Sequence, residues 1–389
     1  MPGFELIGNE ERAELNEIFD QSNGVLFAHG FIPQRNGRYR VREFEKSFSE
    51  KFKCSHVQAT TSGTIAQYIA MLAMGVKAGD EVITQSFTFV ATVEAIIAIG
   101  AVPVIVDIDD TYNMDPVALE NAITQKTKLI IPVHMLGNTA DMEYIQGIAR
   151  RFKIPVLEDG CEALGAKYRG KYSGTLADAG IFSLDFAKTI TTGEGGLIVS
   201  NNAEIHKFCR EFHDHGHESN PALPRGRDTR TIPGLNFRMT EMQAAVGLAQ
   251  LRKLDTIVAI NRRNKQALKE VLKRSDKIKF RRITDDHDEL ADTLIFNFEN
   301  DKLCNNFLKK YLVAGFLTKN VPDAIDWHFA GTWNHMFKNV PSYRDSWDTA
   351  WSKSAQLLNR SVAIPIFVKD SAEKMQERGE AIMRILATL

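Results

Sequence analysis

The sequence has few cysteines, and neither sign of charge predominates. The cysteines are far apart and form no C-x-x-C pair, so the sequence suggests neither a disulfide framework nor a zinc knuckle; they are Cys54, Cys161, Cys209 and Cys304. Lys and Arg number 48 against 49 Asp and Glu, whereas proteins that bind nucleic acid carry a clustered basic excess. We therefore expect a reducing compartment and no nucleic-acid partner.

Long apolar stretches are also missing. No apolar run approaches the roughly 20 residues of a membrane span, and the first residues show no basic segment followed by an apolar core. We expect a cytoplasmic protein with no membrane partner. The function classes that remain are small-molecule chemistry and protein contacts.

The chain has the length of two domains, because its 389 residues exceed the size at which one hydrophobic core keeps growing. Apolar strands alternate with helices along residues 57–200, which predicts an α/β fold with a mostly parallel sheet covered on both faces. The predicted strands are 81–84, 101–107, 129–134, 154–159, 180–185 and 197–200, and the clearest helices are 10–19, 41–52, 65–74 and 241–260.

The C-terminal third predicts a smaller α+β unit. Strands are expected at 279–282 and 293–298, and helices at 304–311 and 373–386. We place the large domain at 1–250, of which roughly the first 30 residues can pack elsewhere, and the small domain at 251–389.

Lys188 is the residue around which the chemistry is organised. It follows a predicted strand and precedes the glycine turn Gly193-Glu-Gly-Gly196. A lysine held by turns at a strand end has a positioned amine that burial can bring toward neutrality, as Schiff-base chemistry requires. An ordinary solvated surface lysine would look the same in isolation.

Two further signals are ambiguous when each is considered alone. Ser62-Gly63-Thr64 begins a predicted helix, where free backbone N–H groups form an anion site, but such residues also serve as a plain N-cap. Asp159 ends a buried strand, at the sheet edge where ligands of parallel sheets collect. There it can meet a cation or simply cap a turn.

One cofactor would use all of these signals together. Pyridoxal phosphate (PLP) needs an amine for the imine, an anion cradle, an apolar or aromatic surface for its ring, and a carboxylate beside the pyridine nitrogen. Lys188, the Ser62-Gly63-Thr64 turn, Phe89 and Asp159 are candidates for these four roles. The joint pattern is far more specific than its parts.

The same residues carry a family resemblance. Over roughly residues 30–260 the chain resembles the DegT/DnrJ/StrS sugar aminotransferases, through Ser62-Gly-Thr64, Phe87-Thr-Phe89-Val-Ala-Thr, Ile131-Pro-Val-His134, Leu157-Glu-Asp159, Phe182-Ser183 with Lys188 and Gly193-Glu-Gly-Gly196, and Asn236-Phe-Arg-Met-Thr-Glu-Met-Gln-Ala-Ala245. The resemblance implies the type I fold of PLP-dependent aminotransferases. Because a lysine occupies the place where a dehydrating branch has histidine, it also implies transamination.

The resemblance implies a role for each of these residues. Lys188 would form the Schiff base with PLP and later move the reacting proton, and Asp159 would keep the pyridine nitrogen protonated. Phe89 would lie on the ring face. The phosphate would be held by Ser62, Gly63, Thr64 and Ser183. Asn236 would reach the phosphate of a neighbouring subunit, which implies a homodimer with shared active sites.

Glu162 departs from the family, which usually has Gln or His at this place, near the phenolic oxygen of the cofactor. A carboxylate beside a phenolate repels it unless one of the two holds a proton. We therefore hypothesise that Glu162 shares a proton with that oxygen.

The substrate is indicated by resemblance and not by spacing or composition. Residues 158–162 and 188–196 most resemble a branch that makes 8-amino-3,8-dideoxy-manno-octulosonate for lipopolysaccharide. That branch implies amino transfer from glutamate to the C8 aldehyde of 3,8-dideoxy-8-oxo-manno-octulosonate, an acidic sugar. The alternatives are a nucleotide-linked keto sugar as substrate and, from another class, a PLP-binding regulatory protein without turnover.

Two arginine-rich segments are candidates for substrate binding, since guanidinium groups bind a carboxylate or a diphosphate. Solvated surface charge is the alternative for these arginines, which are Arg35, Arg38, Arg225, Arg227 and Arg230. The nearby His213-Asp-His-Gly-His217 has neither the i, i+4 helical spacing nor the cysteines of a metal site. We predict no metal.

Overall fold

The computed structural model describes residues 3–30, 33–285, 287–338, 340, 343 and 349–389. Its main sheet consists of a four-stranded part, β1-β9-β8-β5, and a three-stranded part, β4-β2-β3. Parallel bridges between Ile130 and Val156 and between Val133 and Asp159 join the two parts. The strands are β1 (His56–Thr60), β2 (Glu81–Gln85), β3 (Val102–Val106), β4 (Thr127–Ile131), β5 (Leu157–Asp159), β8 (Ala179–Ser183) and β9 (Gly196–Ser200).

The predicted α/β fold with a mostly parallel sheet is confirmed. Of these strands, β9 runs antiparallel to both of its neighbours, and the other pairings within the sheet are parallel. The residues of β8 and β9 are all buried, because helices cover both faces of the sheet.

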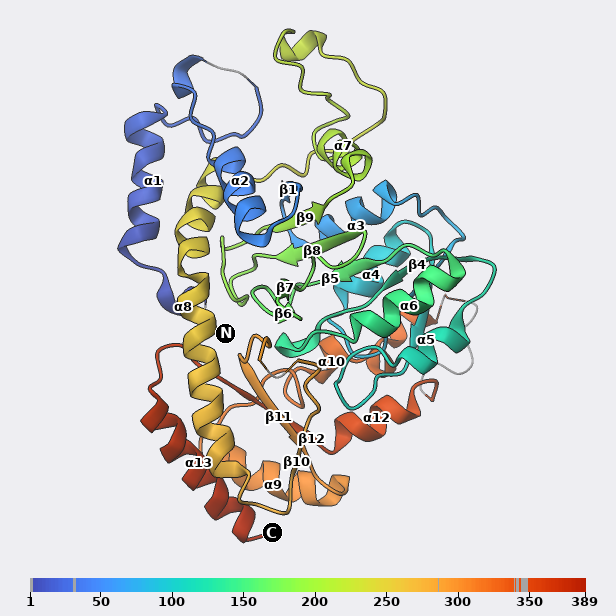
Figure 1. Cartoon of the computed structure of the whole chain (residues 1–389), viewed down its shortest axis with the longest axis vertical. Helices are drawn as coiled ribbons and strands as arrows, with labels where there is room; N and C mark the ends of the chain where they lie inside the picture. Colours follow the sequence, from blue (N-terminus) through green and yellow to red (C-terminus); the bar gives the residue numbers. More distant parts are fainter. Residues whose placement is uncertain (1–2, 31–32, 286, 339, 341–342, 344–348) are drawn as a thin grey trace.

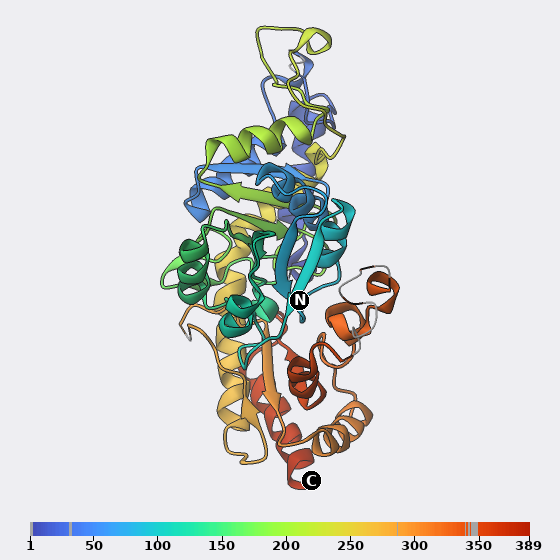
Figure 2. The same ribbon diagram turned by 90° about the vertical axis from the view of Figure 1, so that its right-hand side faces the viewer.

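Apolar helix faces pack on the two sides of the sheet (Figure 1 and Figure 2). One side carries α3 (Gly63–Ala73), α4 (Ala91–Ala98) and α7 (Ala203–Phe212). The other carries α2 (Arg40–Phe52), α5 (Pro116–Ala122), α6 (Met142–Phe152) and the first half of α8. A two-stranded hairpin, β6 (Lys167–Tyr168) and β7 (Lys171–Tyr172), is separate from the main sheet.

The helix α8 (Glu241–Leu272) runs along most of the molecule (Figure 1). Its N-terminus is a capping box, in which the Thr240 side chain accepts from the Gln243 N–H and the Gln243 side chain accepts from the Thr240 N–H. The predicted helix 241–260 and the charged stretch behind it are therefore one element. Helix α1 (Asn9–Gln21) packs on α8, where Lys253 donates to Glu11 at 2.7 Å.

The C-terminal part is built on the antiparallel sheet β10-β11-β12, packed against α9, α13 and the end of α8. Its elements are β10 (Lys279–Phe280), β11 (Thr293–Asn297), α9 (Asp301–Val313), α10 (Ile325–His328), α11 (Asn334–Phe337), α12 (Ser352–Asn359), β12 (Ser361–Pro365) and α13 (Ala372–Ala387). The division of the chain near residue 250 stays a prediction, and α8 continues across that point.

Within the described part of the chain, no helix has both the length and the apolar character needed to cross a membrane. The four cysteines are all free, and three of them are buried. Among the described residues no three His, Cys, Asp or Glu side chains are grouped as a metal site would require.

Candidate active site

Lys188 lies in the loop between β8 and β9, and this loop is tightly held. The N–H of Leu184 donates to the Gly195 carbonyl at 2.8 Å, and the N–H of Thr192 donates to the Leu184 carbonyl at 3.0 Å. Gly196 begins β9 so close to the start of α3 that a Cβ on it would lie 2.1 Å from the Ser62 carbonyl oxygen. The glycine turn is therefore required for the lysine loop and the Ser62 turn to approach each other.

The Lys188 amine is largely buried among acids. Its side chain is 13% exposed, and Nζ lies 4.0 Å from Oε1 of Glu162. Burial on its own would lower the pKa of Lys188, but the charges of Glu162, Cys161 and Asp159 outweigh burial, so the pKa is raised. The sequence-based expectation that burial moves this amine toward neutrality is wrong for the protein without a ligand, because neighbouring acids favour the ammonium.

The start of α3 lies against Ser183. Ser62 is the N-cap and its hydroxyl accepts from the Ile65 N–H at 3.2 Å, while Gly63 and Thr64 are first-turn residues whose N–H groups have no intrahelical acceptor. A Cβ on Gly63 would lie 2.8 Å from Cβ of Ser183. The structure thus brings together the four predicted phosphate-binding residues at a helix N-terminus.

Asp159 ends β5 and is buried, with 4% of its surface exposed. The hydroxyl of Thr92 donates to Oδ2 at 3.0 Å, and the N–H of Cys161 donates to Oδ1 at 3.1 Å. A second threonine supports this arrangement, since the Thr88 and Thr92 hydroxyls are 2.8 Å apart. The carboxylate is consequently fixed in direction.

Phe89 presents its ring to the surface between β2 and α4, although residues on either side of it are buried. The side chain is 40% exposed and stacks on Trp327, with ring centroids 6.2 Å apart and planes 10° apart. The His328 ring is 5.3 Å away. Phe89 is thus an accessible aromatic surface, as a ring-binding residue needs to be.

Glu162 is surrounded by hydrogen-bond donors and cations. The Leu136 N–H donates to Oε2 at 3.2 Å, the Asn320 amide donates to Oε1 at 3.2 Å, and Nε2 of His328 lies 3.6 Å from Oε1. Burial alone would raise the pKa of Glu162, but the nearby His328 imidazole and the charge of Lys188 outweigh burial and lower it. The protonated form of Glu162 is therefore disfavoured in this chain, and the hypothesis that Glu162 shares a proton with the phenolic oxygen of the cofactor stays a prediction.

Asn320 and His328 lie at the site although no sequence motif marks them. Both residues belong to the C-terminal third, where the sequence offers no motif, and they reach the site from 158 and 166 positions beyond Glu162. The only local hint in the sequence is the adjacent aromatic pair Trp327 and His328, and such a pair does not by itself indicate a functional site.

Four of the residues predicted to meet other molecules, Arg225, Arg227, Arg230 and Asn236, lie on the segment between α7 and α8, which projects from the body of the molecule (Figure 1). Asn236 is exposed on this segment, and its neighbour Phe237 accepts at its carbonyl from the Thr61 N–H at 3.1 Å. Arg227 and Arg230 are exposed, and Arg38 is exposed near α2. Within the described residues, none of these three arginine side chains has a hydrogen bond or ion pair.

The other two candidate arginines have structural partners. Arg35 is completely buried, lies 3.5 Å from the carboxylate of Glu241 and stacks over the Tyr39 ring at 4.2 Å. Arg225 donates to Asp214 at 2.7 Å. Their guanidinium groups are therefore already paired within the chain.

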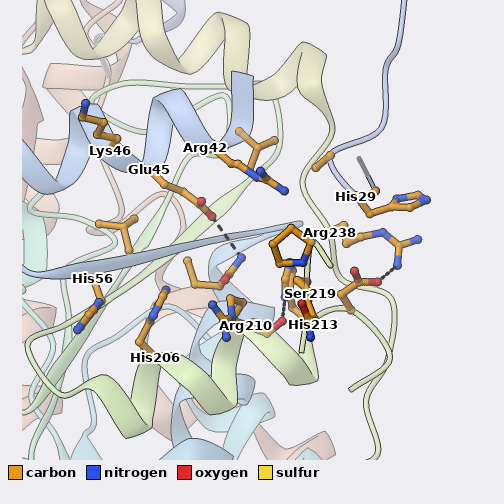
Figure 3. A pocket seen from close by; sticks show the side chains of 18 of the residues that line it. His29, Arg42, Glu45, Lys46, His56, His206, Arg210, His213, Ser219 and Arg238 are labelled. Atoms are coloured by element: carbon orange, nitrogen blue, oxygen red, sulfur yellow. Dashed lines mark hydrogen bonds and ion pairs between the residues drawn. The ribbon is translucent and has the colours of Figure 1, made fainter. Parts of the chain in front are cut away.

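A cavity of about 600 Å³ lies between α2, β1, α7 and the projecting segment (Figure 3). Figure 3 shows Glu45 pointing into it from α2 and His206 from α7. Burial lowers the pKa of His206 and of His213 to about 4, so both imidazoles are neutral at pH 7. Neither Lys188 nor Asp159 lines this cavity, which is distinct from the candidate active site.

Taken together, a lysine amine, a helix N-terminus that a side chain on Gly63 would fill, a fixed carboxylate and an exposed aromatic ring fit the chemical parts of PLP. The fold and this site define the class of type I PLP-dependent aminotransferases. The sequence agrees: residues 26–383 match the DegT/DnrJ/EryC1/StrS aminotransferase family, and the chain belongs to it.

The chain is similar to known proteins both in sequence and in three-dimensional structure. The GDP-perosamine synthase of Caulobacter vibrioides is 44% identical over 228 residues, which are 58% of this chain and 60% of that relative's length. The structure of 3-amino-5-hydroxybenzoic acid synthase superposes with a TM-score of 0.84 at 27% identity, covering 98% of this chain and 97% of that one. The structure of NtdA from Bacillus subtilis with bound cofactor PMP superposes with a TM-score of 0.82 at 27% identity. The match covers 98% of this chain and 83% of that one.

Proposed function

We propose that this protein is a PLP-dependent aminotransferase that moves an amino group from glutamate to the C8 aldehyde of 3,8-dideoxy-8-oxo-manno-octulosonate. The observation that carries the proposed reaction class is the Lys188 amine, held beside Glu162 and near Asp159 next to the Gly63 helix start. Family membership supports the same class. The products are 2-oxoglutarate and the 8-amino sugar.

Each residue of the site has a task in this proposal. PLP, when bound, supplies an electron sink for the bond that breaks at the amino-bearing carbon. Lys188 takes up and returns the proton at that carbon. Asp159 offers a fixed negative charge for the pyridine nitrogen, the N–H groups of Gly63 and Thr64 hold the phosphate, and Phe89 covers the ring.

The acidic sugar is supported by the three arginines without acid partners. Arg227 and Arg230 lie on the projecting segment, and a pair of guanidinium groups is suited to bind a carboxylate bidentately. The amino-acid sequence of residues 158–162 and 188–196 resembles the branch that makes the 8-amino octulosonate, and this resemblance supports an octulosonate in particular. In this reading the enzyme serves lipopolysaccharide synthesis in the cytoplasm.

A homodimer belongs to the same proposal. Asn236 is exposed near the C-terminal end of the segment between α7 and α8, and the outer part of this segment extends away from the body of its own subunit (Figure 2). In a homodimer this segment would contact the second subunit and complete the active site of that subunit. Arg227 and Arg230 would then meet the substrate of the neighbouring subunit.

A nucleotide-linked keto sugar is the second candidate substrate. It is favoured by the 44% identity to a GDP-perosamine synthase, and guanidinium groups also bind a diphosphate. The acid sugar carries its negative charge as a carboxylate, whereas the nucleotide sugar carries it as a diphosphate and adds a base.

The two substrates can be compared directly. The protein, loaded with PLP and converted with glutamate, is mixed with the octulosonate aldehyde or with GDP-4-keto-6-deoxymannose, and the amino sugar is measured by mass spectrometry in a single turnover. The proposal expects amination of the acid sugar at least about a hundredfold faster. Faster amination of the nucleotide sugar would replace the first candidate by the second, and amination of neither would contradict both.

A further inference from the structure

Glu162 accepts hydrogen bonds at both of its carboxylate oxygens. The Asn320 amide donates to Oε1 at 3.2 Å, and the Leu136 N–H donates to Oε2 at 3.2 Å. Burial acts to raise the pKa of Glu162, but the His328 imidazole and the Lys188 charge lower it. The side chain is 5% exposed. A buried negative charge is thus held in one orientation.

Both donors lie in left-handed backbone, which is uncommon for residues other than glycine. The angle φ is 50° at Leu136 and 64° at Asn320. Arg281 holds the first of these turns, because its guanidinium donates to the carbonyl of Met135 at 3.2 Å and to that of Leu136 at 2.5 Å. Such backbone persists only where the surroundings enforce it, and it is concentrated at functional sites. The support of Glu162 is therefore a built part of the site.

The Oε1 atom of Glu162 lies 4.0 Å from Nζ of Lys188. Among the carboxylates that act on Lys188, Glu162 has the largest electrostatic effect. Asp159 has a smaller effect, and its two oxygens already accept hydrogen bonds from Thr92 and Cys161. Glu162 is consequently the acid best placed to meet a cation beside the lysine amine.

Two amines occupy this place in turn during amino transfer. Lys188 and the amino group taken from the donor bond to the same carbon of the cofactor, so the transferred nitrogen comes close to the place of Nζ. A primary amine is mostly protonated at neutral pH. A buried cation is stable only beside an opposite charge. The transferred amino group therefore needs an acid at this point, as Lys188 does.

We propose that the Glu162 carboxylate binds the amino group that the cofactor carries between the two halves of the reaction. Oε1 accepts a hydrogen bond from the ammonium of the aminated cofactor, pyridoxamine 5′-phosphate (PMP). The inference rests on the proposed function, since it requires amino transfer through PLP at this site. It adds a contact to the transferred nitrogen itself, which neither Asp159 nor the N-terminus of α3 provides.

The test compares two ligands that bind without covalent reaction and differ only in the amine. PMP has an aminomethyl group where 4-deoxypyridoxine 5′-phosphate has a methyl group. Calorimetry with the cofactor-free protein gives the Kd of each ligand. Glu162→Gln should raise the Kd of PMP at least about tenfold, because a charged hydrogen bond is lost and the PMP ammonium is left beside that of Lys188. The Kd of the deoxy ligand should not rise, since it offers no ammonium to Glu162.

The deoxy ligand also reports whether the site of the variant is intact. Glu194→Gln is the matched control, because Glu194 is an exposed acid of the loop that carries Lys188. This variant should leave both Kd values unchanged. An unchanged Kd for PMP in Glu162→Gln, or an equal rise for both ligands, would overturn the inference.

The same measurements distinguish this inference from the proposed function. If the unaltered protein binds neither PMP nor the deoxy ligand, the proposed function fails. If the unaltered protein binds both and Glu162→Gln does not discriminate between them, only the role of Glu162 fails.

Discussion

The hydroxyl of Thr92 donates a 3.0 Å hydrogen bond to the carboxylate of Asp159, and this pair joins helix α4 to the end of strand β5. The other carboxylate oxygen accepts from a backbone N–H. An acid that accepts at both oxygens is held in one direction. The site therefore offers a fixed negative charge for a cationic ring nitrogen.

Removing this charge should reduce turnover strongly. We expect Asp159→Asn to lower kcat for amino transfer by about a thousandfold, because a neutral amide cannot stabilise a protonated ring nitrogen. Thr92→Val, which keeps the charge but loses its orienting hydrogen bond, should lower kcat about tenfold. Steady-state rates with glutamate and the sugar check both, and a kcat for Asp159→Asn within a few-fold of the unaltered enzyme would exclude the assigned role.

A side chain at Gly63 should weaken cofactor binding. The added Cβ of Gly63→Ala would lie 2.8 Å from Ser183, so the start of α3 must shift away from the place proposed for the phosphate. We expect the Kd for PLP, measured by fluorescence quenching, to rise at least about tenfold. Gly226→Ala is the matched control, since no atom lies within 4 Å of its Cβ. Equal affinities for the two variants would contradict the assignment.

The arginines on the projecting segment should act on the sugar and not on glutamate. The double variant Arg227→Met with Arg230→Met removes two exposed, unpaired charges, so KM for the acid sugar should rise about tenfold or more. The half-reaction with glutamate should keep its rate. Arg12→Met, an exposed arginine on α1, is the control. An unchanged KM for the sugar would place its carboxylate elsewhere.

Glu45, beside the cavity of Figure 3, should make stability depend on pH. Burial raises its pKa from 4.5 to about 7. The unfolded chain releases this proton near pH 4.5 and the folded chain near pH 7, so stability from this group is complete below pH 4.5 and is lost as pH rises through 7.

Glu45→Gln should consequently stabilise the protein at pH 8 by on the order of 2 kcal/mol and have little effect at pH 4.5. Urea unfolding at the two pH values measures this difference. Glu50→Gln, at an exposed position of the same helix, serves as control. A stabilisation that is equal at both pH values would show that the ionisation of Glu45 is not its cause.

The sequence allowed the fold and much of the site to be predicted because local signals agree with the sheet topology. The ends of β5 and β8 are adjacent in a parallel pair, so Asp159 and Lys188 approach each other wherever that pairing forms. The glycine turn before β9 could be recognised as a signal, and the structure supplies its reason, the close approach of Gly196 to Ser62.

The remaining features depend on contacts between distant segments that no local pattern encodes. The sequence around Arg35 predicts an exposed polar loop. In the structure, however, Arg35 is paired with Glu241, which lies more than 200 positions away in the chain. Burial alone would bring Lys188 toward neutrality, but the acids that surround its amine in the fold raise its pKa instead. His328 reaches Glu162 only because residues 327–328 pair with the backbone of residues 88–90.

In the proposed function, the Lys188 amine is the group that binds the cofactor and carries the reaction. The most direct test is to load the protein with PLP, reduce it with borohydride and map the modified peptide by mass spectrometry. Our account predicts a phosphopyridoxyl group on Lys188 in the peptide that contains residues 182–196, and its loss after addition of glutamate before reduction. Modification of a different lysine, or of none, would contradict it.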